Sequence, residues 1–224
     1  MTDSPDRPRR FDLVVFDWDG TLYDSTAVIV HSLQAACRDL GLPVPDDERA
    51  SWVIGLSLQG AMKHAVPDIT PEQIPQMVDR YRFHYLARQH DLSLFAGALD
   101  MLHALKARHH WLAVATGKSR AGLDEALRSV ELKGLFDGTR TADETRSKPD
   151  PLMLDELMHE FGTTPDRTLM IGDTTHDLQL AANAGTPSVA VTYGAHAVAE
   201  FATHSPLFVA GSVAELSAWL QAHA

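Results

Sequence analysis

The chain has 224 residues, of which 45% are hydrophobic and 22% are charged, and its formal net charge is −11. This size suits one domain with or without a small insert, and this composition supports a packed core and excludes global disorder. The negative charge argues against a nucleic-acid-binding protein, which normally carries a basic face. An anionic ligand would have to be attracted by local cations and backbone N–H groups, because the overall field repels it.

The first ten residues are polar and rich in proline, and we expect a disordered leader at residues 1–10. They lack the apolar segment of a secretion signal, and no stretch of the chain is long enough to span a bilayer. We therefore expect a cytoplasmic protein with no membrane partner. The single cysteine, Cys37, excludes an internal disulfide, and its place in an apolar helical pattern predicts a small buried side chain.

Short apolar runs predict strands that are buried on both faces of a parallel sheet. These runs are residues 13–16, 112–115, 169–171, 189–191 and 207–209. Helical patterns lie between them, at about 97–108, 119–130, 151–161 and 176–184. Strands that alternate with helices predict a right-handed, doubly wound α/β domain with a Rossmann-like parallel sheet.

The interval from residue 25 to residue 93 interrupts this alternation, because it contains helical patterns but no convincing strand. One helix is predicted over residues 25–40, and a capping box at residues 70–73 predicts another that runs to about Gln89. We therefore expect a helical cap domain inserted into a core domain. The cap comprises residues 25–93, and the core comprises residues 11–24 and 94–224.

The first segment that could carry chemistry is FDWDGTL, at residues 16–22, directly after the first predicted strand. Ligands bind beyond the carboxyl ends of strands in open α/β sheets. Asp17 and Asp19 could therefore serve as a nucleophile and a proton-transfer group, and Gly20 allows a tight turn close to a ligand. The alternative interpretation is an acidic loop with a turn glycine.

The second segment, VATGKS, follows the next buried strand at residues 114–119. Thr116 offers a hydroxyl, and Gly117 lets its N–H group come close to an oxyanion. The alternative interpretation is a polar loop with a helix N-cap at Ser119.

The third segment, SKPDP, spans residues 147–151. It places Lys148 before a proline-flanked helix start, where its ammonium group could balance carboxylates and phosphate oxygens. A solvated surface lysine is the alternative interpretation.

The fourth segment, MIGDTTHD, spans residues 170–177 and begins within the third predicted strand, residues 169–171. Asp173 comes at the end of the strand, and Asp177 at the opening of a helix. Carboxylate oxygens of this kind suit Mg²⁺, which binds a few carboxylates and keeps several waters. The alternative interpretation is an N-cap followed by a carboxylate that favours the helix dipole.

In this order, the four segments resemble the motifs of the haloacid dehalogenase superfamily, and the resemblance extends over about residues 11–222. The insert after the first motif is similar to that of the helical-cap subfamily. Two short sequences are most similar to those of phosphoglycolate-phosphatase-like members of the superfamily. They are TADET, which precedes Ser-Lys-Pro, and the tripeptide Gly-Asp-Thr. Trp18 departs from the small aliphatic residue that is commoner between the two aspartates.

The resemblance implies a Mg²⁺-dependent phosphatase. Asp17 would attack phosphorus and form an aspartyl-phosphate, while Asp19 would protonate the leaving oxygen and then deprotonate a water. Asp17, the backbone carbonyl of Asp19, and Asp173 would bind Mg²⁺. Asp177 would orient Lys148 or a water on the metal.

The same resemblance implies which groups hold the transferring phosphoryl oxygens. These groups are the side chains of Thr116 and Lys148 and the backbone N–H groups of Trp18, Asp19 and Gly117. Lys118 and Arg120 are candidates to meet a substrate carboxylate.

The insert would be a mobile cap that excludes water and reads the leaving group, with hinges near residues 22–25 and 94–97. Within the cap, Gly55, Ser57 and Gln59 belong to the loop that we expect to face the substrate, although a plain turn between helices is nearly as good an interpretation. Surface positions are expected for Lys63 and for the pair His109 and His110.

The predicted function is hydrolysis of a small phosphorylated metabolite, and 2-phosphoglycolate is one candidate. A sugar phosphomutase with the same core, and a non-catalytic phosphate-binding regulatory module, stay open as alternatives. Asp19 argues against a dehalogenase, which has no leaving oxygen to protonate. We expect no nucleic-acid partner and make no prediction of the oligomeric state.

Overall fold

The computed structural model describes residues 9–130, 132 and 134–224, so the first eight residues of the predicted leader lie outside the described residues. Its centre is a sheet of parallel strands in the order β3-β2-β1-β4-β5-β6. The strands are β1 (Leu13–Phe16), β2 (Trp111–Thr116), β3 (Gly138–Thr141), β4 (Thr168–Gly172), β5 (Ser188–Val191) and β6 (Phe208–Ala210). The predicted doubly wound α/β fold is therefore confirmed, and the strand order reverses between β1 and β4.

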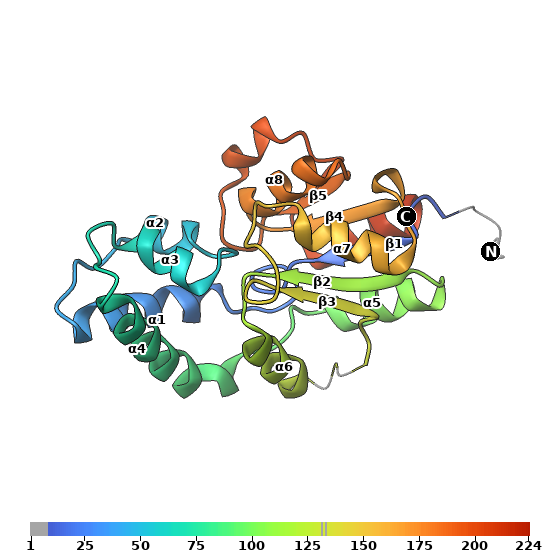
Figure 1. Cartoon of the computed structure of the whole chain (residues 1–224). Coiled ribbons are helices and arrows are strands. Elements are labelled where there is room, and N and C mark those ends of the chain that lie inside the picture. Colours follow the sequence, from blue (N-terminus) through green and yellow to red (C-terminus); the bar gives the residue numbers. More distant parts are fainter. Residues whose placement is uncertain (1–8, 131, 133) are drawn as a thin grey trace.

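Helices cover both faces of the sheet because alternate residues of each strand point to opposite faces. Val14 and Phe16 of β1 pack in the cluster that includes α5 (Ala98–Ala107), α6 (Arg120–Ser129) and α9 (Val213–His223). Leu13 and Val15 pack on the other face, against α7 (Leu152–Phe161) and α8 (Thr175–Ala184). Figure 1 shows α7 and α5 on opposite sides of the sheet. Short 3₁₀ turns are η1 (Gln89–Asp91), η2 (Pro165–Arg167) and η3 (Val198–Thr203).

The interval between β1 and α5 is helical and lies to one side of the sheet (Figure 1). It contains α1 (Thr26–Asp39), α2 (Asp47–Trp52), α3 (Leu58–Ala65) and α4 (Gln73–Arg88). These helices share a hydrophobic cluster of their own, with Leu33, Met62 and Met77 at its centre, and Cys37 is fully buried in it as expected. We call residues 25–93 the helical insert.

The capping box predicted at the start of α4 is only half formed. The backbone N–H of Thr70 donates to Gln73 Oε1 at 2.9 Å. The N-cap residue of the helix is Glu72, whose side chain makes no capping hydrogen bond. The helix nevertheless ends within a residue of the predicted position, because its apolar face packs on α1 and α3.

The two chain segments that join the insert to the sheet lie side by side. Tyr23 forms an antiparallel bridge with Leu94. The N–H of Asp24 donates to Ser93 O at 3.0 Å, and the N–H of Phe95 donates to Leu22 O at 3.0 Å. A motion of the insert would therefore pivot about two hydrogen-bonded connecting segments, at the positions where we predicted hinges.

Strand β3 has no counterpart among the predicted strands. Its sequence, GTRT, is polar, and its residues are mostly only half-buried because it lies at the edge of the sheet. An edge strand has one neighbour and needs no continuous apolar run. Over the described part of the chain, no helix is both long and apolar enough to cross a membrane.

Candidate active site

The loop after β1 places Asp17 at the carboxyl edge of the sheet. Its backbone N–H donates to Ile171 O at 2.8 Å, so the ladder of β1 and β4 fixes the residue. The side chain is 1% exposed. Oδ1 accepts a hydrogen bond from Lys148 Nζ at 2.6 Å, while the buried Oδ2 has no partner among the described residues. Burial raises the pKa of Asp17 above its usual value, although Lys148 acts in the opposite direction.

Lys148 is fully buried and bridges two carboxylates. Its Nζ donates to Asp17 Oδ1 and to Asp177 Oδ1, both at 2.6 Å. Burial alone would lower the pKa of Lys148, but the two carboxylates outweigh it and raise the pKa above its usual value. The lysine therefore stays charged, and it does not occupy the solvated surface position that was the alternative interpretation.

Asp177 is held in place by the start of α8. Its Oδ2 accepts from Thr174 Oγ1 at 2.7 Å and from the Thr174 N–H at 3.1 Å, which together with the Thr174 cap forms a capping box. The other oxygen, Oδ1, faces Lys148. The same carboxylate thus serves the helix start and orients the lysine, so the capping interpretation and the functional one are compatible.

Asp173 lies under the loop of the first motif. Its Oδ1 accepts from Thr21 Oγ1 at 2.7 Å, and its Oδ2 accepts from the Ala195 N–H at 2.8 Å. Gly20 has φ +83°, and any side chain there would overlap the Asp173 carboxylate. Burial, and then the nearby Asp17 and Asp177 carboxylates, raise the pKa of Asp173.

Asp17, Asp173 and Asp177 each offer an oxygen within 4.8 Å of the others, and all three are buried. Three buried carboxylates supply oxygen ligands of the kind that a divalent metal ion prefers, and Lys148 alone leaves the cluster with excess negative charge. The side chain of Asp19 lies outside this cluster, and the expectation that its backbone carbonyl faces a metal stays a prediction.

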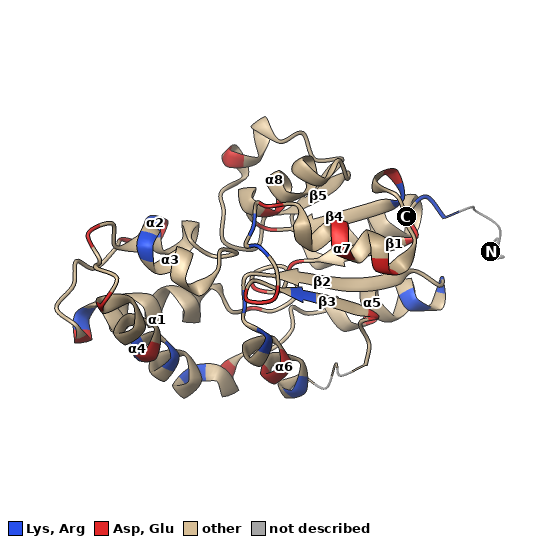
Figure 2. Cartoon of the chain, viewed as in Figure 1, with Lys and Arg blue, Asp and Glu red and all other residues tan. Residues whose placement is uncertain are grey.

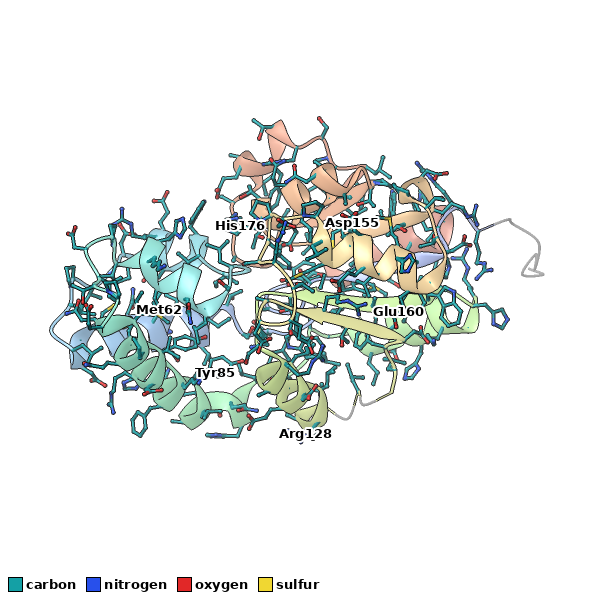
Figure 3. The ribbon with its side chains drawn as sticks, viewed as in Figure 1. Met62, Tyr85, Arg128, Asp155, Glu160 and His176 are labelled. Carbon is teal, nitrogen blue, oxygen red and sulfur yellow. The ribbon has the colours of Figure 1, made fainter. Side chains whose placement is uncertain are left out.

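The Asp19 carboxylate belongs to a different set of contacts. Its Oδ1 accepts from Ser25 Oγ at 2.6 Å and lies 3.1 Å from Lys118 Nζ. The same ammonium donates to Tyr85 Oη at 3.1 Å and lies 4.7 Å from the centre of the Tyr85 ring. Residues from the sheet and from α4 thus meet at Asp19 (Tyr85 is labelled in Figure 3).

Gly117 lies directly beneath the loop that joins α2 to α3. A Cβ atom at Gly117 would overlap the carbonyl oxygens of Gly55 and Leu56. The Ser57 N–H donates to Ser147 Oγ at 2.9 Å, which links this loop to the segment before Lys148. Thr116 is buried, and its Oγ1 accepts from the Lys118 N–H at 3.2 Å.

A cavity of about 610 Å³ lies between the helical insert and the sheet edge. The predicted residues that line it are Asp19, Gly55, Ser57, Gln59, Gly117 and Lys118. Ser57 also caps α3 by accepting from the Gly60 N–H at 3.3 Å. The structure therefore brings the predicted loop, the second motif and Asp19 around one space. Figure 2 shows acidic and basic segments meeting in the loops between the sheet and the insert.

Two of the predicted site residues have side chains that lie elsewhere. Trp18 is fully buried in the core, 5.4 Å from Tyr23 and 6.3 Å from Phe136 between ring centres, so only its backbone can face a ligand. Arg120 is outside the cavity lining and pairs with Glu144 and Asp124, so these contacts do not support the expectation that it meets a substrate carboxylate, which stays a prediction.

Sequence reasoning missed a contact between the insert and the sheet. The carbonyl of Trp52, at the end of α2, accepts from His176 Nε2 at 2.9 Å and from His196 Nε2 at 3.0 Å. His196 Nδ1 in turn accepts from the Thr175 N–H at 3.1 Å, which leaves the proton on Nε2. We call Trp52, His176 and His196 the histidine clamp (His176 is labelled in Figure 3). No spacing signal marks these histidines, because they lie in separate segments.

The surface position predicted for His110 is also wrong. The side chain is 1% exposed, and Nδ1 donates to Phe11 O at 2.9 Å. Its neighbour His109 is exposed as expected. The Trp111 N–H donates to Asp12 O at 2.8 Å where β1 and β2 begin side by side, which places the preceding His110 next to Phe11.

The fold and the site together are those of an α/β protein with a cluster of buried carboxylates at the carboxyl edge of its parallel sheet. The chain belongs to the haloacid dehalogenase-like hydrolases, whose family model matches residues 14–191. The predicted resemblance to this family is therefore confirmed.

The chain is 33% identical over 210 residues to a protein of Dickeya dadantii named "Probable phosphatase IndB", with 91% of both chains covered. It is 34% identical to a phosphoglycolate phosphatase of Aliivibrio fischeri, with 81% of this chain and 84% of the relative covered. The crystal structure of a hydrolase from Pseudomonas syringae superposes with a TM-score of 0.86 at 25% identity, covering 93% and 97% of the two chains. These relatives confirm the prediction that the chain is a phosphatase of this family.

Proposed function

We propose that the chain is a Mg²⁺-dependent phosphomonoesterase that acts through an aspartyl-phosphate formed on Asp17, with a small phosphorylated metabolite as its substrate. The observation that carries this proposal is the environment of the Asp17 carboxylate. One oxygen is held by Lys148, and the other is buried close to Asp173 with no hydrogen-bond partner among the residues that the structure describes. A buried oxygen without a partner is costly unless a ligand meets it.

The carboxylate cluster fits a divalent metal ion. Asp17 and Asp173, with the backbone carbonyl of Asp19, would hold it, and Asp177 would keep Lys148 beside Asp17. When bound, Mg²⁺ would neutralise charge so that a carboxylate and a phosphate can approach each other.

In the first half of the reaction, a carboxylate oxygen of Asp17 forms a bond to phosphorus as the bond from phosphorus to the leaving oxygen breaks. Asp19 gives its proton to that oxygen. Its position supports this role, because Asp19 faces the cavity whereas Asp17 is buried behind it. Lys148 and the Thr116 hydroxyl would bind the phosphoryl oxygens, together with backbone N–H groups of Trp18, Asp19 and Gly117.

In the second half, a water attacks phosphorus and gives a proton to Asp19. The bond between phosphorus and Asp17 breaks, and inorganic phosphate leaves with both aspartates restored. The helical insert would exclude bulk water while the ester is bound, since its loop at Gly55 and Leu56 lies against Gly117. The separate hydrophobic clusters of insert and sheet support the division into a cap, residues 25–93, and a core.

The test is release of phosphate from p-nitrophenyl phosphate, first with Mg²⁺ and then after removal of bound metal with excess EDTA. The wild type should be active only with the metal, and Asp17→Asn should lose at least about a thousandfold in kcat, because an amide is not a nucleophile. The matched control is Asp24→Asn, which makes the same change at an exposed carboxylate and should retain activity.

Full activity in EDTA would contradict the metal requirement. Turnover of Asp17→Asn within tenfold of wild type would contradict the assigned nucleophile. Transfer of phosphate within a sugar phosphate, without net release, would indicate the phosphomutase alternative instead.

A further inference from the structure

The cavity between the insert and the sheet edge has a defined position relative to the proposed chemistry. It begins at Asp19, which would protonate the leaving oxygen, and at Lys118 beside it. From there it extends into the insert, along α1, α3 and α4. The alcohol released from the ester would therefore lie in this cavity, if the proposed function holds.

The inner wall of the cavity is apolar. Leu56 and Leu58 line it with half-buried side chains, and the buried Leu33 and Met62 belong to the cluster behind them. Val78 and Tyr81 add the facing side of α4. Figure 3 places Met62 within the insert and Tyr85 on its side toward the sheet. A wall of this kind stabilises a ligand in proportion to the apolar surface that the ligand buries.

Aromatic rings form part of this wall. Tyr81 and Tyr85 lie one turn apart on α4, with ring centres 5.8 Å apart and planes inclined by 23°. Burial raises the pKa of Tyr85 to about 12, so its hydroxyl is neutral at physiological pH. The two rings thus add neutral contact surface next to Lys118 and Asp19.

The cations in the cavity are poorly placed for a small anionic leaving group. Among the described residues of its lining, Lys118 and Arg82 carry positive charge. Lys118 is already paired with Asp19 and bonded to Tyr85 Oη, and Arg82 is exposed at the rim. A two-carbon carboxylate such as glycolate would compete with Asp19 for Lys118 and leave the apolar wall uncovered.

The volume agrees with a larger ligand. Pockets that enclose drug-sized molecules measure about 300–1,000 Å³, and this cavity measures about 610 Å³. We propose that the natural substrate is a phosphate monoester of a bulky, largely apolar alcohol, which fills the space lined by Leu56, Val78 and Tyr81, rather than 2-phosphoglycolate. This proposal rests on the proposed function, because it names the substrate class of the same site.

The test is a homologous series of n-alkyl phosphates from methyl to octyl, with benzyl phosphate and 2-phosphoglycolate, assayed on the wild type with Mg²⁺. The alcohols from ethanol upward have similar acidity, so the series varies the buried surface and not the chemistry. We expect kcat/KM to rise by about twofold to fourfold for each methylene until the cavity is filled. 2-Phosphoglycolate should lie at least tenfold below the best member.

Tyr81→Ala should reduce the gain for each methylene, because it removes part of the wall, and its Tm should be compared with that of the wild type. Phe83→Ala is the matched control, since Phe83 lies on the same helix but is 58% exposed and outside the lining. It should leave the dependence on chain length unchanged.

The outcomes separate this inference from the proposed function. The enzyme could release phosphate from p-nitrophenyl phosphate but show no increase in kcat/KM along the alkyl series, or prefer 2-phosphoglycolate. Either result would overturn the inference about the substrate and leave the proposed function standing. No hydrolysis of any ester would overturn both. If kcat/KM increases along the alkyl series and benzyl phosphate is unreactive, the substrate is the ester of a flexible aliphatic alcohol. If benzyl phosphate has a higher kcat/KM than every alkyl phosphate, the substrate is the ester of an aromatic alcohol.

Discussion

Lys148 shows how a single residue links distant parts of the site. Its ammonium lies between Asp17 and Asp177, which come from opposite ends of the sequence. Buried charges are costly to leave unpaired, so removal of any one of the three side chains would leave its partners uncompensated. The sequence motifs predicted that these residues converge, because each follows a parallel strand or opens the helix after one.

His110 lies far from the site and gives a prediction about stability. Burial lowers the pKa of His110 to about 4, against the effect of its hydrogen bond to Phe11 O. Below the ordinary pKa of about 6.5, the unfolded chain binds a proton that the folded chain does not bind until about pH 4. As the pH is lowered from about 6.5 to about 4, the free energy of unfolding should therefore decrease. His110 contributes at most about 3 kcal/mol to this decrease.

His110→Asn keeps a donor for the Phe11 carbonyl but cannot titrate, so its stability should depend less on pH between pH 7 and 4.5. Urea unfolding at both pH values gives the measurement. The exposed neighbour serves as control, because His109→Asn should keep the wild-type pH dependence. If the free energy of unfolding changes with pH equally in His110→Asn and the wild type, another group titrates in this range.

At the scale of elements, α2 is attached to the sheet domain by its last carbonyl. The histidine clamp gives Trp52 O two donors, from α8 and from the loop after β5. The Trp52 ring also lies against both imidazoles, at 4.7 Å from His176 and 6.2 Å from His196 between ring centres. The clamp ties α2 to the sheet domain next to Gly55, where an added Cβ atom would lie 3.2 Å from Thr174 Oγ1. We therefore expect the clamp to favour closure of the insert over the sheet edge.

We expect His176→Phe to weaken this closure, since it keeps the ring contact but removes one donor. The loss of about 0.5–1.5 kcal/mol for one hydrogen bond corresponds to roughly a twofold to tenfold fall in kcat/KM. Hydrogen exchange should quicken in peptides covering residues 52–57. His176→Gln, which restores a donor, should recover both quantities.

The control for the clamp is His64→Phe, because His64 contacts the same Trp52 ring but belongs to the insert itself and does not bridge to the sheet. It should leave exchange and kcat/KM near wild type. If His176→Phe behaves like this control, the clamp does not determine closure.

For the whole molecule, binding of a divalent metal ion at the carboxylate cluster would be coupled to folding. Burial opposes ionisation of Asp17 and Asp173, and a divalent cation would relieve their repulsion only in the folded state. At a Mg²⁺ concentration one hundred times its Kd, this linkage adds about 2.7 kcal/mol. For a chain of this length, Tm should rise by about 5–11 °C.

Thermal unfolding with and without Mg²⁺ measures this effect independently of activity. Asp173→Asn should remove most of the increase in Tm, and Ca²⁺ should produce a smaller one because Mg²⁺ demands tighter octahedral geometry. Asp24→Asn should retain the full increase. An equal increase in wild type and Asp173→Asn would place the metal elsewhere on this acidic chain.

The sequence alone determined five of the six strands in the described sheet and the identity of the groups at their carboxyl ends. Continuous apolar runs mark strands buried on both faces, and the residues directly after Phe16, Ala115 and Ile171 carry the motifs. These signals lie within single segments, so they predict the strands and the site residues from the sequence without a structure. The polar edge strand β3 has no such signal, because one of its sides has no neighbouring strand.

Only the tertiary structure decided how the insert meets the site. The pairing of Lys118 with Asp19 and Tyr85, the clamp on Trp52 and the burial of His110 join segments far apart in the chain. The apolar wall of the cavity likewise combines faces of α1, α3 and α4, which from periodicity alone are indistinguishable from ordinary core. Contacts of this kind depend on the packing of whole elements, and no spacing of residues along one segment encodes them.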